Sequence, residues 1–489
     1  MIEFLLNGRT EKVDHTDPNL SILEWLRTKM RLTATKEGCA SGDCGACTVI
    51  TGTPDQAGNI QYEAINSCIS LVGSLHGKEL ITLEAFQQEP GHPVQTGMVD
   101  QYGAQCGFCT PGIVMSLIAL HAQREGRAIK DHDIMEALSG NLCRCTGYRP
   151  IVDAGRQAMT QFWAPENDDH PAVGLASNRA RPELAKIRSD DVTLESGNGQ
   201  RYHAPASLKA LRNLRRDYPE SRLVAGSTDL ALEITQQLKT LDHLISVERV
   251  AELKDCRLED NELVIGAAAT YQQFRSPLSA LWPDFDAMVE RLGSLQIRSR
   301  GTLGGNIANA SPIGDMPPPL IALEATLVLD GPEGERSMPV EEFFKGYRQT
   351  DLQPGEFVHS VRVQVPRENQ RLFIYKVSKR LDDDISAVLG AFRLTIENGT
   401  VTDCRLAFGG MAATPARALN AEKALLGQPW AETSVAGAIA ALATDFSPLS
   451  DVRASAGYRL QVAGNLLRRA LLASGSGQGN PQLMVTDYA

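Results

Sequence analysis

At 489 residues the chain is too long for one ordinary hydrophobic core, so three or four domains are expected. It is 43% hydrophobic and 22% charged, which is typical of a globular protein, and its net charge of −11 argues against a nucleic-acid-binding protein. No apolar run approaches the roughly 18 residues that span a bilayer, and the start lacks a signal-peptide pattern, so a cytoplasmic location is expected.

Eight of the ten cysteines fall into two groups of four, and the two that remain, Cys256 and Cys404, stand alone. In a reducing compartment, close spacing of this kind indicates metal ligation rather than disulfides. We interpret the two isolated cysteines as small buried hydrophobic residues. The two groups are Cys39, Cys44, Cys47, Cys68 and Cys106, Cys109, Cys143, Cys145.

Residues 1–85 alternate short strand-like runs with glycine turns and contain one predicted helix, 21–30, with Ser21 as its cap. The loop that follows has the spacing C-x4-C-x2-C with a distant fourth cysteine, which is the plant-type ferredoxin arrangement for a 2Fe–2S cluster. Gly38, Gly42 and Gly45 would let the backbone wrap tightly and point N–H groups at sulfur. A structural zinc site is the alternative, but zinc usually pairs two C-x2-4-C units.

Residues 86–162 are predicted to be helical and to carry the second cysteine group, a C-x2-C pair and a C-x-C pair. Pro111 suits the first turn of one helix, and Asp131 and Asp133 suit the cap of another. Cys106 and Cys109 would then lie where a helix N-terminus favours anionic sulfur. Four thiolates select zinc, copper or an iron–sulfur cluster, and this spacing alone leaves zinc open.

Residues 163–194 lack periodicity and are rich in proline and charge, which predicts a linker. Beyond it, an apolar strand at 223–230 opens into a glycine and hydroxyl turn, and a second glycine-rich turn lies at 301–305. Such turns offer exposed N–H donors to a phosphate. Neither turn matches the dinucleotide fingerprint or the P-loop, so a simple turn is the alternative reading.

Residues 370–474 are predicted to form a further α+β unit, and 475–489 a flexible tail. A hairpin over 391–408 is indicated by the Asn-Gly turn at 398–399, and a helix is expected over 455–469. On residue type alone, Lys376 would be a solvated lysine and residues 382–384 a solvated acidic loop.

Taken together, these motifs resemble the iron–sulfur and flavin subunit of bacterial xanthine dehydrogenases, within the molybdenum hydroxylase family. The resemblance covers nearly the whole chain, and its most specific segments are the three that contain cysteines. It rests on 38–47, 105–112 and 141–150, and further along on 302–306, 310–315, 344–348 and 408–415.

The resemblance implies an α+β multidomain chain. The expected domains are a β-grasp, ferredoxin-like 2Fe–2S domain at 1–85, a helical-bundle 2Fe–2S domain at 86–162, a linker at 163–194, a mixed α/β FAD-binding domain of non-Rossmann type at 195–369, and a C-terminal flavoprotein α+β domain at 370–474. Each group of four cysteines would hold one cluster.

By position, the resemblance also implies which residues hold FAD. The diphosphate would be held by Leu223, Val224, Ala225, Gly226, Ser227, Thr228, Asp229 and Leu230, together with Thr302, Leu303, Gly304, Gly305 and Asn306. Asp315 would help to fix the cofactor, and Leu292, Val358 and Lys376 would lie near the flavin. Leu292 stands where animal relatives have an aromatic residue. Asp383 and Asp384 match acidic residues near the flavin ring.

The function implied is that of an electron-transfer subunit. Electrons from xanthine or hypoxanthine hydroxylation at a molybdopterin site would pass through two 2Fe–2S clusters to FAD and then to NAD+. The hydroxylation site would lie on a separate large subunit, so no catalytic residue is expected here, and the assembly would be a heterotetramer of two small and two large subunits. The alternatives are an aldehyde or N-heterocycle dehydrogenase, oxygen as terminal acceptor, or a zinc-bound assembly or regulatory protein.

Overall fold

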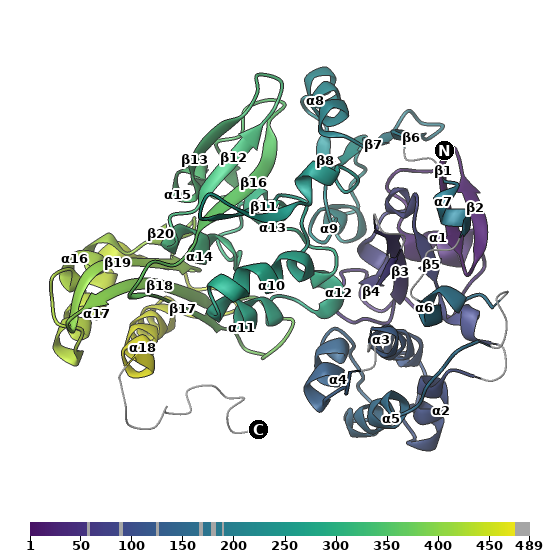
Figure 1. The fold of residues 1–489 in the computed structure, drawn as a ribbon, viewed down its shortest axis with the longest axis horizontal. Coiled ribbons are helices and arrows are strands. Elements are labelled where there is room, and N and C mark those ends of the chain that lie inside the picture. The colour runs from purple at the N-terminus through teal and green to yellow at the C-terminus, as the bar shows by residue number, and fades with distance from the viewer. Residues whose placement is uncertain are drawn as a thin grey trace. The chain divides into compact units, whose positions relative to one another are not determined.

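The computed structural model describes residues 1–55, 59–87, 91–123, 127–165, 170–177, 182–187 and 190–474 (Figure 1). The chain forms two units. Unit 1 consists of Met1–Glu252 with Gly293–Gly301, and unit 2 of Leu253–Leu292 with the described residues from Thr302 onward. The tail predicted at 475–489 lies outside the described residues. None of the helices described is long and apolar enough to cross a membrane.

The N-terminal sheet of unit 1 has the mixed topology of a β-grasp domain, as predicted for 1–85. Its strand order is β2-β1-β5-β3-β4, and only β1 and β5 are parallel. The helix that packs on it begins after Ser21, whose hydroxyl accepts the N–H of Glu24, so the predicted cap is confirmed. The elements are β1 (Ile2–Leu6), β2 (Arg9–Val13), α1 (Ile22–Thr28), β3 (Thr48–Pro54), β4 (Ile60–Asn66) and β5 (Glu79–Ile81).

Four helices follow, which confirms the predicted helical domain: α2 (Pro93–Asp100), α3 (Thr110–Ala122), α4 (Asp131–Leu138) and α5 (Arg149–Met159). Pro111 lies in the first turn of α3, where its missing N–H has no cost. The Asp133 carboxylate accepts the N–H of Lys130 at 2.7 Å and so caps α4. Helix α3 is buried on nearly all sides, so it forms the centre of this domain.

The segment predicted as a linker is packed rather than free wherever it is described. It contains the short helices α6 (Val173–Ser177) and α7 (Pro182–Ala185). Ala172, Leu175 and Leu184 are buried in the same hydrophobic core as the helical domain. These apolar residues are too few and too widely spaced to give a periodic signal, which is why the sequence did not reveal them.

The last part of unit 1 is a small mixed sheet of order β6-β7-β9-β8. Strand β9 runs parallel to both of its neighbours, and β6 is antiparallel to β7. The elements are β6 (Val192–Glu195), β7 (Arg201–Ala204), α8 (Leu208–Asp217), β8 (Arg222–Val224), α9 (Leu230–Thr235) and β9 (His243–Ser246). Segment Gly293–Gly301, which contains α12 (Leu295–Arg298), also belongs to unit 1.

Unit 2 begins with an antiparallel five-stranded sheet of order β10-β11-β16-β12-β13. The apolar faces of α10, α11 and α14 share a core with it through residues such as Phe274, Phe285 and Leu320. The elements are β10 (Cys256–Glu259), β11 (Glu262–Gly266), α10 (Tyr271–Leu281), α11 (Asp284–Glu290), α13 (Leu303–Ala308), α14 (Pro317–Ala322), β12 (Thr326–Asp330), β13 (Arg336–Pro339), α15 (Val340–Phe343), β14 (Phe344–Gly346), β15 (Gln349–Thr350) and β16 (Phe357–Gln364).

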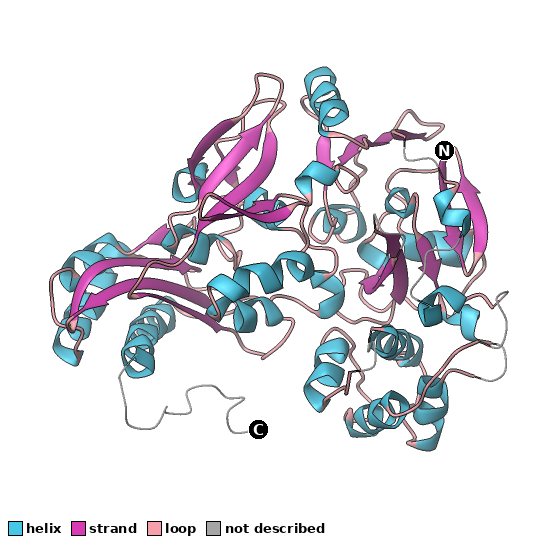
Figure 2. Ribbon diagram, viewed as in Figure 1, coloured by secondary structure: helices cyan, strands magenta, loops and turns pink. Residues whose placement is uncertain are grey.

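The C-terminal part of unit 2 is an antiparallel sheet, β17-β18-β19-β20, with three helices packed on it (Figure 2). The predicted hairpin is confirmed: Asn398 and Gly399 both have positive φ, at 49° and 78°, as a tight two-residue turn requires. The elements are β17 (Gln370–Val377), β18 (Val388–Glu397), β19 (Thr400–Gly409), β20 (Ala416–Arg417), α16 (Leu419–Leu425), α17 (Glu432–Asp445) and α18 (Ala456–Ser474). Helices and mostly antiparallel sheets give the α+β class that was predicted.

Candidate functional site

The first cysteine group is formed by Cys39, Cys44 and Cys47 in the loop after α1, together with Cys68 in the turn after β4. The Sγ atoms of Cys47 and Cys68 are 3.3 Å apart, and Cys39 is hydrogen-bonded to both Cys44 and Cys68. Cys47 and Cys68 are buried, and the other two are partly exposed. The hydrogen bonds from Cys44 and Cys68 lower the pKa of the Cys39 thiol, and the same contact with Cys39 raises the pKa of Cys44. Thiols this close to one another are coupled in their ionisation, and four sulfur atoms gathered at one place could together ligate a metal centre.

Backbone N–H groups in this loop point at sulfur, as the glycine content predicted. The Ser41 N–H donates to the Cys39 Sγ at 3.4 Å. Gly45 has a φ of 67°, and a Cβ on Gly38 would lie 2.8 Å from the Cys44 Sγ. The loop therefore has no room for larger residues, and its N–H donors would stabilise thiolates.

The second cysteine group lies at the start of α3 and in the loop before α5. Cys109 is the residue before α3, Cys143 is buried, and Cys106 and Cys145 are exposed. Hydrogen bonds from the Phe108 N–H and from Cys145 lower the pKa of Cys106. Burial and a hydrogen bond with Cys143 raise the pKa of Cys109 to about 12. The structure thus arranges the four thiols as two contacting pairs, Cys106 with Cys145 and Cys109 with Cys143.

Two residues beside Cys143 were not assigned a role from the sequence. The Thr146 hydroxyl lies 3.2 Å from the Cys143 Sγ, and the Tyr148 hydroxyl accepts the Cys143 N–H at 3.0 Å. Burial opposes ionisation of Cys143, but the hydrogen bonds from Thr146 lower its pKa overall. Polar residues one to three positions beyond a C-x-C pair were the available signal for these partners.

The two cysteine-bearing loops adjoin each other through their backbones. The Leu142 N–H donates to the Cys44 carbonyl at 3.0 Å, and the Asn141 side chain donates to the Gly45 carbonyl at 3.1 Å. A Cβ on Gly112 would lie 2.0 Å from that same Gly45 oxygen. A continuous path of covalent bonds and one hydrogen bond therefore connects the two thiol groups.

Segment Gly293–Gly301 supplies buried polar side chains that hold this region of unit 1 together. The Gln296 amide donates to the Asn141 side chain and to the Ser116 hydroxyl, each at 3.0 Å. Arg298 is fully buried and forms an ion pair of 2.8 Å with Glu136. Sequence reasoning missed these residues. The only indication of their role in the sequence was the alternation of long polar residues at Gln296, Arg298 and Arg300.

The first predicted FAD segment, Leu223–Leu230, lies in unit 1 at the end of β8 and the start of α9. A Cβ on Gly226 would lie 1.7 Å from the Arg300 carbonyl, so only glycine fits. Ser227 has a φ of 60°, and its hydroxyl donates to the carbonyl of Ile69 at 2.6 Å. Ile69 directly follows Cys68, so this turn is attached to the first cysteine group.

The second predicted turn, Thr302–Asn306, lies in unit 2. The Thr302 hydroxyl accepts the Gly305 N–H at 3.1 Å and caps α13. A Cβ on Gly304 would lie 2.5 Å from the Ala267 Cβ, and the Gly304 N–H donates to the Ala267 carbonyl at 2.9 Å. Packing against Ala267 explains why glycine occupies position 304, and Gly305 is exposed.

The other predicted flavin residues, Asp315, Leu292, Val358 and Lys376, all lie in unit 2. The Lys376 Nζ lies 2.6 Å from an Asp315 oxygen, and the Ser386 hydroxyl donates to the other oxygen at 2.6 Å. The Lys376 side chain is 3% exposed, so the reading of a solvated lysine from residue type was wrong. Leu292 and Val358 belong to the hydrophobic core of this unit.

Arg291 was not singled out from the sequence, yet it fixes the acidic loop that follows β17. Its guanidinium donates to the carbonyls of Lys376 and Leu381, at 2.9 and 3.0 Å, and to the Ser378 hydroxyl at 3.2 Å. Within the loop, burial tends to raise the pKa of Asp384, but hydrogen bonds from backbone N–H groups lower it overall. The loop is therefore anchored in place rather than freely solvated.

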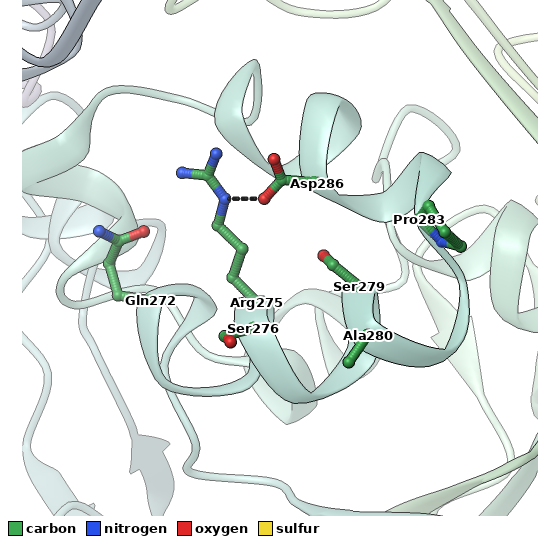
Figure 3. A pocket seen from close by; sticks show the side chains of 7 residues that line it. All are labelled: Gln272, Arg275, Ser276, Ser279, Ala280, Pro283 and Asp286. Carbon is green, nitrogen blue, oxygen red and sulfur yellow. Dashed lines mark hydrogen bonds and ion pairs between the residues drawn. The ribbon is translucent and has the colours of Figure 1, made fainter. Parts of the chain in front are cut away.

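A pocket of about 570 Å³ lies between α10 and α11 (Figure 3). Figure 3 shows Arg275 reaching toward Asp286, with which it forms an ion pair of 2.7 Å. No residue predicted to bind a cofactor lines this pocket, whose residues are Gln272, Arg275, Ser276, Ser279, Ala280, Pro283 and Asp286.

Three parts of the sequence match known families. Residues 82–156 match a 2Fe–2S binding domain, residues 195–367 the FAD binding domain in molybdopterin dehydrogenase, and residues 373–474 the C-terminal domain of the CO dehydrogenase flavoprotein.

The chain is 33% identical to a xanthine dehydrogenase of Emericella nidulans, over 91% of this chain and 36% of the relative. It is 30% identical to xanthine dehydrogenase 1 of Arabidopsis thaliana, over 87% of this chain and 36% of that protein. The chain thus spans little more than a third of the length of these curated relatives.

Among solved structures, the carbon monoxide dehydrogenase from Hydrogenophaga pseudoflava aligns with a TM-score of 0.54 and 32% identity, over 56% of this chain and 96% of that chain. The quinoline 2-oxidoreductase from Pseudomonas putida 86 aligns with a TM-score of 0.52 and 27% identity, over 56% of this chain and 95% of that one.

Proposed function

The chain belongs to the xanthine dehydrogenase and molybdenum hydroxylase family, as the FAD and 2Fe–2S part of an oxidoreductase, and we propose that it is the electron-transfer subunit of a xanthine dehydrogenase. In this proposal it passes electrons from a molybdopterin partner, which hydroxylates xanthine or hypoxanthine, to NAD+. When bound, the clusters supply one-electron carriage and FAD supplies the conversion to two-electron chemistry.

The contact between the two cysteine loops carries this proposal. Each cysteine group presents four thiols with N–H or hydroxyl donors beside sulfur, which is a donor set that suits a 2Fe–2S cluster. The Leu142 to Cys44 hydrogen bond joins the loops directly. We therefore assign one cluster to Cys39, Cys44, Cys47 and Cys68, and a second to Cys106, Cys109, Cys143 and Cys145.

The residues proposed to hold FAD are the two glycine turns together with Asp315, Leu292, Val358 and Lys376. Asp315 neutralises Lys376 inside the protein, so the end of β17 can carry a buried cation without a large cost. The Ser227 hydroxyl donates to the carbonyl of Ile69, so the first of these turns is hydrogen-bonded to the residue that follows Cys68 of the first cysteine group.

We place xanthine hydroxylation on a molybdopterin-binding partner subunit, since this chain covers 96% of a chain from carbon monoxide dehydrogenase and 95% of one from quinoline 2-oxidoreductase. The proposed assembly is a heterotetramer of two small and two large subunits, working in the cytoplasm. An N-heterocycle or aldehyde dehydrogenase is the second candidate, since quinoline 2-oxidoreductase is among the similar structures. Assaying the native complex with xanthine, quinoline and an aldehyde as substrates distinguishes these candidate activities.

The experiment that tests the proposal uses the purified chain. We expect a red-brown protein with about four irons, about four acid-labile sulfides and one FAD per chain. It should oxidise NADH with an artificial acceptor and leave xanthine unchanged. Turnover of xanthine by the chain alone would contradict the division of labour, and a colourless protein that carries zinc would favour an assembly or regulatory role.

A further inference from the structure

The end of the β12–β13 hairpin in unit 2 brings two carboxylates and an imidazole together. One ligand atom from each of Asp330, Glu335 and His359 lies within 4.8 Å of the other two. Asp330 is fully buried, His359 is partly buried and Glu335 is exposed. We propose that these three residues bind one divalent transition-metal ion. This site is separate from the cysteine groups and does not depend on the proposed redox function.

The strand register explains why the two carboxylates lie close together. The pairing of β12 with β13 ends with Leu329 opposite Arg336, and Asp330 and Glu335 are the next residues beyond that last pair. Carboxylate oxygens brought within 4.8 Å of each other in this way can coordinate one cation together.

A β-bulge delivers the imidazole to the same place. On the other side of β12, Val328 pairs with Ser360 and Leu329 pairs with Val358, so His359 is the extra residue of β16. Bulges redirect a side chain out of the regular alternation of a strand. The His359 Nδ1 lies 3.1 Å from the Ser360 hydroxyl, a contact that fixes the orientation of the ring.

The donor set selects the kind of metal. Carboxylate oxygens alone would suit magnesium or calcium, but an imidazole nitrogen favours zinc, iron, nickel or copper. Three protein ligands with one side open to solvent at Glu335 leave room for water to complete the coordination. Zinc is therefore the appropriate probe.

The bulge also supports the second glycine turn. The His359 carbonyl accepts the N–H of Ala267 at 2.9 Å, and the Ala267 carbonyl accepts the N–H of Gly304 at 2.9 Å. A metal that fixes the backbone of β16 at His359 would thus make this turn more rigid. Its role would be structural, as a clamp that fastens the hairpin end to the central strand of the sheet.

The test is calorimetric titration of Zn²⁺ into the chelator-treated, cofactor-loaded full chain and three variants. Wild type should bind one zinc ion at this site. The affinity of Glu335→Gln and of His359→Gln for that ion should be at least about 100-fold lower. Glu335 is exposed, so its replacement should leave the fold intact, which circular dichroism and iron content would check. Glu333→Gln, an exposed carboxylate in the same turn, is the matched control and should bind zinc as wild type does.

All variants keep every cysteine, so any zinc taken up by thiols is common to them. Equal zinc stoichiometry and affinity in wild type, Glu335→Gln and His359→Gln would overturn the proposal. Calcium that binds the wild type as tightly as zinc would overturn the role given to the imidazole.

Discussion

The N–H of Leu142 donates to the carbonyl oxygen of Cys44 across 3.0 Å. Cys44 belongs to one cysteine group, and Leu142 directly precedes Cys143 of the other. The separation between the two groups is therefore set by backbone packing and not by flexible side chains. That packing depends on the close approach of neighbouring backbone at Gly45, whose φ is 67°.

Gly45→Ala should separate the two loops. The added Cβ would lie 2.3 Å from the Gly140 carbonyl, which is backbone and has little freedom to move. We expect a loss of about 1–3 kcal/mol in the free energy of unfolding from overpacking, beyond the cost of the left-handed conformation. Urea denaturation measures the loss, and rapid-mixing reduction would show slower electron transfer between the clusters.

Gly77→Ala is the matched control for this change. Gly77 has a φ of 76° and nothing within 4 Å of an added Cβ, so it carries only the conformational cost. Equal destabilisation by the two substitutions would show that the loops do not depend on close packing at Gly45.

Glu136→Gln should weaken the attachment of segment Gly293–Gly301 to the helical domain. Arg298 is fully buried, and its ion pair with Glu136 is 2.8 Å long. Removing one charge of a fully buried pair costs roughly 3–5 kcal/mol, and since Glu136 remains 19% exposed we expect about 2 kcal/mol.

Thermal and urea unfolding would measure this loss. The exposed pair between Arg257 and Glu259 provides the control, because Glu259→Gln should change stability by less than about 1 kcal/mol. If Glu136→Gln had the same free energy of unfolding as wild type, Arg298 would have to be paired with another counter-charge.

Local elements were predictable because their signals are local. The Ser21 cap, the Asn398-Gly399 turn and the helix that begins near Pro111 each follow from a few adjacent residues. The grouping of the cysteines was likewise visible in their spacing, and the structure brings both groups together.

Long-range polar partners could not be predicted in the same way. Gln296 meets a partner 155 residues away in Asn141, and Lys376 meets Asp315 across 61 residues. Propensity and periodicity describe neighbours along the chain and do not show which polar side chains meet inside the fold. The burial of Lys376 follows from such a partner, which is why residue type alone misplaced it.

Asp315→Asn should release FAD and destabilise unit 2. Lys376 would then be a buried cation without its counter-charge, at a cost of roughly 3 kcal/mol or more. We expect a lower FAD content after gel filtration and a lower melting temperature. Asp286→Asn, which removes the partner of Arg275 at an exposed carboxylate in the same unit, should leave both unchanged. Full retention of FAD and stability by Asp315→Asn would argue against this role.

His203 should make unit 1 less stable in mild acid. Burial, followed by the charges of His243 and Arg201, lowers the pKa of His203 from 6.5 to about 4. The unfolded chain therefore takes up the proton first as the pH falls. The stabilising contribution of neutral His203 is fully present above about pH 6.5 and is lost progressively toward about pH 4.

We expect the urea concentration at the unfolding midpoint to decrease as the pH is lowered from about 7 to about 5. His203→Phe should reduce that decrease, and it keeps an aromatic ring that can stack on Tyr218. His15→Gln alters an exposed histidine and should leave the pH dependence as it is. An unchanged slope in His203→Phe would assign the effect to other groups.

The claim that each cysteine group holds a 2Fe–2S cluster is tested most directly by electron paramagnetic resonance of the dithionite-reduced chain. Wild type should give two distinct paired-iron signals, Cys44→Ser should lack one of them, Cys143→Ser should lack the other, and Cys256→Ser should keep both. A wild-type sample without paired-iron signals, or two variants that lose the same signal, would contradict the account.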